Sequence, residues 1–218
     1  MKDIENLFTP SFSAEDVTIH SRKRLFQGFF AIDGYELSYR TFSGGRTPLL
    51  SRELFTRDKN AVGVLAWDRK TDEVALIEQF RPGALKDEKS PWLIEMAGGL
   101  IDDGESEIEA ALREVYEETG LEIKESDLYR ISSVYSSPGG MSERVTIFVA
   151  NTSLEHLPSH GGESCEDEDI RIFRVKSDEA YENVKNGNIR AAIAMIAIMA
   201  LKLEKAEIER FFAAADEG

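Results

Sequence analysis

Apolar and polar residues alternate in several segments of the chain, a pattern that is typical of β-strands. The first, RLFQGFFAIDGYELSYRTF at residues 24–42, predicts a β-hairpin that turns at Asp33–Gly34. A second hairpin is predicted where AVGVLAW (61–67) and EVALIEQF (73–80) flank the polar segment DRKTD. Further strands are predicted at residues 91–99, where the strand enters a glycine turn, and at 128–137, 144–150 and 170–175.

One segment combines helical periodicity with clear helix ends. Ser106 and Glu109 form a predicted capping box, and Gly120 occupies the position at which helices commonly end. The sequence therefore predicts a helix between Ser106 and Gly120. Its core-facing stripe follows the spacing i, i+3, i+4 and i+7 and comprises Ile108, Ala111, Leu112, Val115 and Thr119.

The rest of the C-terminal half is predicted to be a loop followed by two helices. The loop covers residues 151–169, and the helices cover Ser177–Asn186 and Asn188–Phe212. The apolar stretch at residues 191–203 is too short to span a bilayer, so we expect a helix that fills the core. Several strands with few helices indicate an α+β fold in which helices pack on a mixed sheet.

The composition narrows the class of function. The 218 residues are 42% hydrophobic and carry a net charge of −15, which argues against a nucleic-acid partner because such binding depends on Lys and Arg. Cys165 is the only cysteine, so an intrachain disulfide and a Cys-rich zinc site are excluded. The first ten residues lack the features of a signal peptide. We expect a cytoplasmic protein that binds neither membrane nor nucleic acid.

Three acidic residues crowd the second half of the predicted helix. Glu114, Glu117 and Glu118 repel one another, and the helix dipole favours acids only in the first turn. A solvated acidic face is one interpretation. The other is a site for a hard divalent cation, Mg²⁺ or Mn²⁺, which takes carboxylate oxygens as ligands.

The spacing around these acids favours the metal site. Residues 99–121 fit the pattern G-x5-E-x7-R-E-U-x-E-E-x-G-U, where U is a bulky aliphatic residue, and they resemble the Nudix box of the Nudix hydrolases. The resemblance implies an α/β/α sandwich and Mg²⁺-dependent hydrolysis of nucleoside diphosphate derivatives. It implies that the three glutamates bind metal and that Arg113 orients them. The matching residues are Gly99, Glu105, Arg113, Glu114, Val115, Glu117, Glu118, Gly120 and Leu121.

Flanking segments are similar to the ADP-ribose pyrophosphatase branch of that family. They include IEQFRPGA and PWLIEMAGG before the box and SSPGGMSERV and ESCEDEDI after it. This resemblance implies that Glu166 is the general base and that Glu168 and the carbonyl of Gly98 are further metal ligands. On charge alone, the acidic segment around Glu166 would be interpreted as a solvated loop.

The same resemblance implies a set of substrate contacts. Arg81 would face the phosphates, Glu143 the terminal ribose, and Phe29 and Arg52 the adenine. Each also has an ordinary structural interpretation, as a core phenylalanine or as a surface charge. The branch further implies a homodimer, with residues 1–57 forming a β-rich dimerisation segment and residues 58–218 forming the Nudix domain.

The resulting functional hypothesis is hydrolysis of ADP-ribose to AMP and ribose 5-phosphate. A GDP-mannose or other nucleotide-sugar pyrophosphatase is the first alternative, since those relatives share the PGG and EDEDI segments. A non-catalytic ADP-ribose sensor is less favoured, because such modules lose box acids that this chain keeps. RNA decapping would need a basic surface, and an NADH-cleaving relative would need more cysteines.

Overall fold

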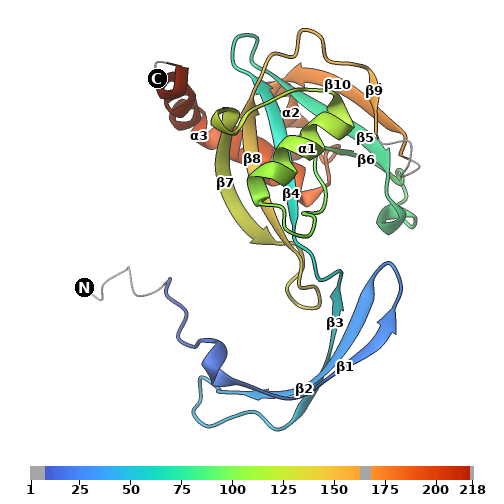
Figure 1. Ribbon diagram of the computed structural model, residues 1–218, viewed down its shortest axis with the longest axis vertical. Coiled ribbons are helices and arrows are strands. Elements are labelled where there is room, and N and C mark those ends of the chain that lie inside the picture. Colours follow the sequence, from blue (N-terminus) through green and yellow to red (C-terminus); the bar gives the residue numbers. More distant parts are fainter. Residues whose placement is uncertain (1–7, 163–167, 217–218) are drawn as a thin grey trace. The chain divides into compact units, whose positions relative to one another are not determined.

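The computed structural model describes residues 8–162 and 168–216 (Figure 1). Among these residues the chain forms two compact units. The first comprises the chain up to Asp58 together with Ser137–Ser142, and the second comprises Lys59–Ser136 and the chain from Glu143 onward. Each unit is described by itself below.

The first unit is an antiparallel sheet of three strands in the order β1-β2-β3. The strands are β1 (Val17–Gln27), β2 (Ala31–Tyr39) and β3 (Leu50–Thr56), and a short 3₁₀ turn, Ala14–Asp16, precedes them. The later segment Ser137–Ser142 joins this unit through Phe55, whose N–H donates to the carbonyl of Gly140 at 2.8 Å. Every residue of β1 is exposed within the described chain.

A hairpin exists in this region, but the predicted hairpin with its turn at Asp33–Gly34 is wrong. The chain turns between Gln27 and Ala31, and Asp33 and Gly34 lie inside β2. Asp33 is buried and accepts hydrogen bonds from Arg22 and Arg24 of the neighbouring strand, which hold its charge within the sheet. The Asp-Gly pair is a strong turn signal from sequence, but here a cross-strand ion pair outweighs it.

The second unit contains a mixed sheet of seven strands among the described residues. The strand order is β7-β8-β4-β5-β10-β9, and β6 pairs with β5. β4 and β8 are parallel, and the other pairs are antiparallel. The strands are β4 (Ala61–Asp68), β5 (Glu73–Phe80), β6 (Trp92–Glu95), β7 (Leu128–Tyr135), β8 (Arg144–Asn151), β9 (His160–Gly161) and β10 (Ile170–Lys176).

Three of these strands bear directly on the predictions. The β4–β5 hairpin is confirmed, since Trp67 pairs with Val74 across the predicted turn. The expected loop at residues 151–169 is wrong in one respect, because it contains the short strand β9, which pairs with β10. A two-residue strand has no periodicity that a sequence pattern can reveal.

Beyond that turn, β4 and β5 separate and the glycine segment before α1 lies next to β4. The N–H of Val64 donates to the carbonyl of Ala97 at 2.7 Å, and the N–H of Val62 donates to that of Gly99 at 2.9 Å. β6, which directly precedes this segment, pairs with β5 instead. The chain therefore enters α1 from within the sheet, which fixes the helix relative to the strands.

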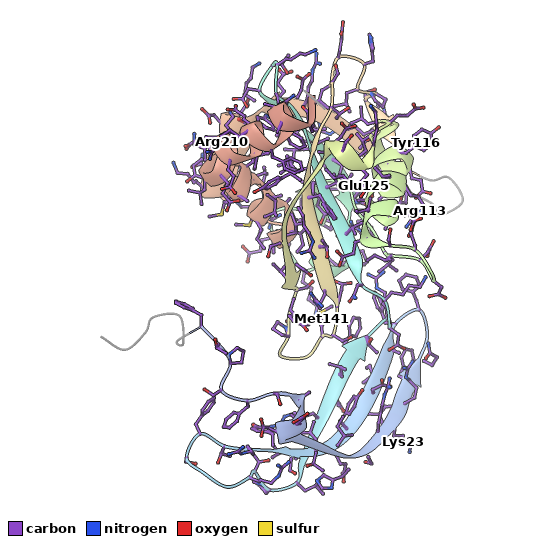
Figure 2. All side chains as sticks on the ribbon, turned by 60° about the vertical axis from the view of Figure 1, so that its left-hand side comes forward. Lys23, Arg113, Tyr116, Glu125, Met141 and Arg210 are labelled. Carbon is purple, nitrogen blue, oxygen red and sulfur yellow. The ribbon has the colours of Figure 1, made fainter. Side chains whose placement is uncertain are left out.

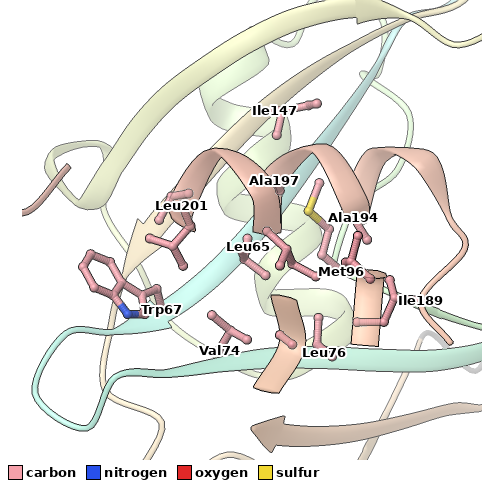
Figure 3. Close-up of a cluster of buried hydrophobic side chains, with 14 of the residues drawn as sticks. Leu65, Trp67, Val74, Leu76, Met96, Ile147, Ile189, Ala194, Ala197 and Leu201 are labelled. Carbon is pink, nitrogen blue, oxygen red and sulfur yellow. The ribbon is translucent and has the colours of Figure 1, made fainter. Parts of the chain in front are cut away.

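Helices cover both faces of the sheet, which confirms the α/β/α sandwich. One apolar cluster joins the sheet to α1 (Glu107–Thr119), and a second, larger one joins it to α2 (Ser177–Lys185) and α3 (Ala192–Asp216). Figure 3 shows part of the second cluster, with Ala197 and Leu201 of α3 above Leu65 of β4. α3 thus fills the core, as the sequence predicted.

No helix in the described parts of the chain has the length and apolar character needed to cross a membrane.

Candidate active site

The helix α1 begins and ends where the sequence predicted. The hydroxyl of Ser106 accepts the N–H of Glu109, and the Glu109 carboxylate accepts the N–H of Ser106, which completes the capping box. Gly120 ends the helix with φ of 68°, a left-handed conformation that favours glycine. Ala111 and Val115 of the predicted stripe are fully buried against the sheet. This packing leaves the flank with Glu114 and Glu118 facing the glycine segment.

Arg113, which is labelled on α1 in Figure 2, contacts three of the acids of this region. Its Nε donates to Glu105 at 2.9 Å and its Nη2 to Glu105 and to the carbonyl of Leu100, both at 2.8 Å. Its Nη1 donates to Glu114 at 2.7 Å and to Glu117 at 2.9 Å. All five N–H groups of the guanidinium are therefore used. These contacts raise the pKa of Arg113 and lower the pKa of Glu105.

Glu118 is the deepest carboxylate of the site, with 3% of the residue exposed. Its Oε2 accepts the N–H of Gly98 at 2.8 Å. Burial raises the pKa of Glu118 to about 8, and the nearby charges of Glu168 and Glu114 add to the effect. Burial also raises the pKa of Glu114, and Glu117 and Glu168 contribute in the same direction. Several negative charges thus oppose one another at one place.

The two glycines before α1 make room for this cluster. A β-carbon on Gly98 would meet the carbonyl oxygen of Val62 and lie 2.8 Å from Cα of Gly63, so only glycine can lie this close to β4. A β-carbon on Gly99 would occupy the place of the Glu114 carboxylate. The carbonyls of Ala97 and Gly99 bond to β4, while the N–H of Gly98 bonds to Glu118.

Arg81 belongs to the same region, and it has a partner that the sequence analysis missed. Its Nε and Nη2 both donate to Oε2 of Glu95, at 2.8 and 2.7 Å. The positive charge of Arg81 acts to lower the pKa of Glu118, so it faces the acidic cluster. The register of β5 on β6 brings Glu95 to this face, and the only signal in the sequence was the place of Glu95 in the predicted strand that enters the glycine turn.

The other predicted acidic residues, Glu143, Glu166 and Glu168, differ in their relation to the cluster. Glu168 is close enough to Glu114 and Glu118 to act on both pKa values, whereas Glu166 lies outside the described residues. Glu143, between β7 and β8, accepts a hydrogen bond from the hydroxyl of Ser136 at 3.0 Å, and no described contact joins it to the carboxylates.

Phe29 and Arg52 belong to the first unit. Phe29 lies in the turn between β1 and β2, is 79% exposed, and packs edge-on against Phe30. The guanidinium of Arg57 lies 5.2 Å from its ring centroid. Arg52 is exposed on β3, and its Nη1 donates to the carbonyl of Ser51 at 2.8 Å. Phe29 is thus a surface residue, and the interpretation as a core phenylalanine is wrong.

The donor set of the acidic cluster suits a divalent cation. Carboxylate oxygens are the ligands of hard cations, and a cation would relieve the repulsion that raises the pKa of Glu114 and Glu118. As the side chains stand, no three His, Cys, Asp or Glu residues among 8–162 and 168–216 converge as a metal centre. Arg113 holds one oxygen each of Glu114 and Glu117, so metal binding would use their other oxygens or a changed rotamer.

A family comparison agrees with this geometry. Residues 57–193 match the family model described as the NUDIX domain, which covers more than half of the chain and includes the whole acidic helix. The chain belongs to the Nudix family. Nudix hydrolases in general use divalent metal ions, in keeping with the carboxylates of α1.

Curated Nudix relatives cover nearly the whole chain. The ADP-ribose pyrophosphatase of Escherichia coli strain K12 is 39% identical over 193 residues, which cover 88% of this chain and 91% of that protein. The ADP-ribose pyrophosphatase of Haemophilus influenzae is 35% identical over 202 residues, or 91% and 92% of the two chains. The GDP-mannose pyrophosphatase of Cronobacter sakazakii is 31% identical over 191 residues, or 86% and 96%.

A solved structure shares the Nudix fold. The crystal structure of an ADP compounds hydrolase superposes with a TM-score of 0.68 at 23% identity and covers 90% of this chain and 98% of that one. This likeness concerns the fold alone.

Proposed function

We propose that this Nudix protein hydrolyses the diphosphate of ADP-ribose to AMP and ribose 5-phosphate, with Mg²⁺ as the cofactor and Mn²⁺ as the alternative cation. The observation that carries the proposal is the buried carboxylate cluster of α1, with Glu118 bonded to the Gly98 N–H and every donor of Arg113 engaged. The names of the relatives that are 35–39% identical support ADP-ribose as the substrate.

The chain supplies the metal site with oxygen ligands. Glu114, Glu117, Glu118 and Glu168 would hold the cation, and the carbonyl of Gly98 would add a backbone oxygen. When bound, the cation supplies charge neutralisation for the diphosphate and acidifies water. Arg113 keeps the carboxylates oriented, because its fixed fork contacts three glutamates at once. Glu166 is proposed as the base that takes a proton from the attacking water.

Arg81 is proposed to bind a phosphate oxygen of the substrate. Glu95 accepts from Nε and Nη2 of the Arg81 guanidinium. No described contact engages Nη1, so Nη1 can donate to an anion. Glu143 is proposed to contact the terminal ribose. Phe29 and Arg52 are proposed to contact the adenine of the substrate, in a homodimer to which the β-rich segment at residues 1–57 contributes.

A second candidate is hydrolysis of GDP-mannose or another nucleotide sugar. The 31% identity with the GDP-mannose pyrophosphatase of Cronobacter sakazakii favours it, since that protein also aligns over 86% of this chain. Both candidates share the carboxylate cluster and would differ in the contacts to base and sugar.

The test is hydrolysis of a substrate panel that contains ADP-ribose, GDP-mannose, ADP-glucose and NADH, each with Mg²⁺ and with EDTA. We expect Mg²⁺-dependent turnover that is strongest on ADP-ribose and is lost in Glu118→Gln. The matched control is Glu122→Gln, because Glu122 is exposed just beyond α1. A preference for GDP-mannose would favour the second candidate. Tight binding of a nucleotide without turnover would contradict the enzyme hypothesis and favour a non-catalytic sensor.

A further inference from the structure

The strand β9 lies directly against the C-terminal end of α1. A β-carbon on Gly161 would meet the carbonyl oxygen of Glu118 and would lie 3.0 Å from its carbonyl carbon. It would also lie 2.8 Å from Cδ1 of Ile172. Carbon atoms in good contact are about 3.5–4.0 Å apart, so this space admits no side chain. Because the obstacle is helix backbone, a rotamer change cannot relieve it.

The next residue makes a second close approach, to Glu168. A β-carbon on Gly162 would lie 2.9 Å from Cβ of Glu168, 3.2 Å from its carbonyl oxygen and 3.2 Å from Cγ1 of Ile170. Gly162 also has φ of +99°, a conformation that residues with side chains rarely adopt. Two consecutive glycines therefore contact the residues that carry two of the carboxylates.

This short stretch is fixed on the sheet side as well. Gly161 pairs with Ile170 of β10, and the N–H of Ile172 donates to the carbonyl of Ser159 at 2.9 Å. β9 is therefore enclosed between β10 and the end of α1. A shift of β9 away from α1 would carry the backbone at Gly162 and Glu168 with it.

The carboxylates on either side of this contact interact electrostatically. The charge of Glu168 contributes to the raised pKa of both Glu114 and Glu118. Glu168 belongs to a separate segment of the chain, just before β10. Gly161 contacts the backbone of Glu118 on one side of this pair, and Gly162 contacts Glu168 on the other.

We propose that Gly161 and Gly162 are positioning residues that set the distance between Glu168 and the carboxylates of α1, and with it the affinity for the divalent cation. This inference rests on the proposed function in one respect, that these carboxylates bind metal. Both glycines lie outside the Nudix box, so this role would not follow from the box pattern.

The experiment compares Gly162→Ala with Gly187→Ala in the full chain. Gly187 has φ of +70° and no heavy atom within 4 Å of its would-be β-carbon, so its variant carries backbone strain without a contact to the site. Mn²⁺ binding is measured by calorimetry without substrate, and kcat, KM and urea unfolding are measured beside it. Gly161→Ala is a second test variant, which is used if Gly162→Ala folds poorly.

We expect Gly162→Ala to weaken Mn²⁺ binding and to lower kcat by on the order of 10–100-fold each, the usual effect of disturbing a metal ligand's support. KM should change little, and Gly187→Ala should bind Mn²⁺ as the wild type does even if it loses as much stability. Unchanged Mn²⁺ affinity in both Gly162→Ala and Gly161→Ala would overturn the inference, as would equal losses in Gly187→Ala. If the wild type binds Mn²⁺ but does not hydrolyse ADP-ribose, the proposed function fails while the metal-binding comparison still decides this inference.

Discussion

Replacing Glu118 by Gln should inactivate the protein and at the same time stabilise it in the absence of metal. Glu118 is almost fully buried, and burial raises its pKa from an ordinary 4.5 to about 8. A group whose pKa is higher in the folded state stabilises the fold below its unfolded value, and that stability is lost as pH rises through the folded value. For Glu118 the loss extends from pH 4.5 to about 8.

The size of the effect follows from the two pKa values. The difference between about 8 and 4.5 is about 3.5, and each pH unit corresponds to about 1.4 kcal/mol, so the full loss is about 5 kcal/mol. Between about pH 5 and about pH 8.5 the wild type should lose about 4 kcal/mol of this. Glutamine does not titrate, and its side-chain carbonyl can still accept the N–H of Gly98.

The assay is urea unfolding in EDTA at these two pH values. The free energy of unfolding of Glu118→Gln minus that of the wild type should be small at the lower pH and should rise by several kcal/mol at the higher one. Glu122→Gln, an exposed control, should show no such rise. Saturating Mg²⁺ should stabilise the wild type much more than Glu118→Gln. A stability difference that does not depend on pH would refute the claim that burial raises the pKa of Glu118.

Three further predictions concern the supports of the site. Ser106→Ala should lower the free energy of unfolding by about 1 kcal/mol, measured by urea unfolding, because it removes the hydrogen bond that the N–H of Glu109 donates to the Ser106 hydroxyl. Leu201→Ala should lower the free energy of unfolding by about 2–5 kcal/mol in the same assay, because it leaves a cavity in the apolar cluster on the face away from α1. The kcat should be unchanged. Glu95→Gln should raise KM for ADP-ribose more than it lowers kcat in steady-state kinetics, because Arg81 loses its ionic partner. An unchanged KM would show that Arg81 does not need Glu95.

Features that depend on neighbours in sequence were predicted well. The start of α1 follows from Ser106 and Glu109 and its end from Gly120, and each of these residues lies within one turn of the helix end that it determines. The β4–β5 hairpin follows from two apolar runs and a polar turn between them. The fixed spacing of the box placed Glu114 and Glu118 on one flank, and the structure shows both buried there.

Features that depend on contacts between distant segments were missed or placed wrongly. The Asp-Gly turn was overruled because Asp33 is paired with Arg22 and Arg24 across the strand. Glu95 gained its role only through the register of β6 on β5, which no local pattern reveals. β9 exists because two residues pair with β10, and this length carries no periodic signal.

The two faces of the sheet in the second unit serve different purposes, one stability and the other the acidic site. The α3 face holds the larger apolar cluster, in which Trp67 and Phe212 are fully buried, whereas the α1 face carries the acidic helix. Substitutions that are selected for heat tolerance can therefore accumulate on the α3 face with little effect on turnover. Changes in metal preference are expected on the opposite side, where Glu114 and Glu118 of α1 lie. The fold thus allows durability and chemistry to evolve on separate surfaces.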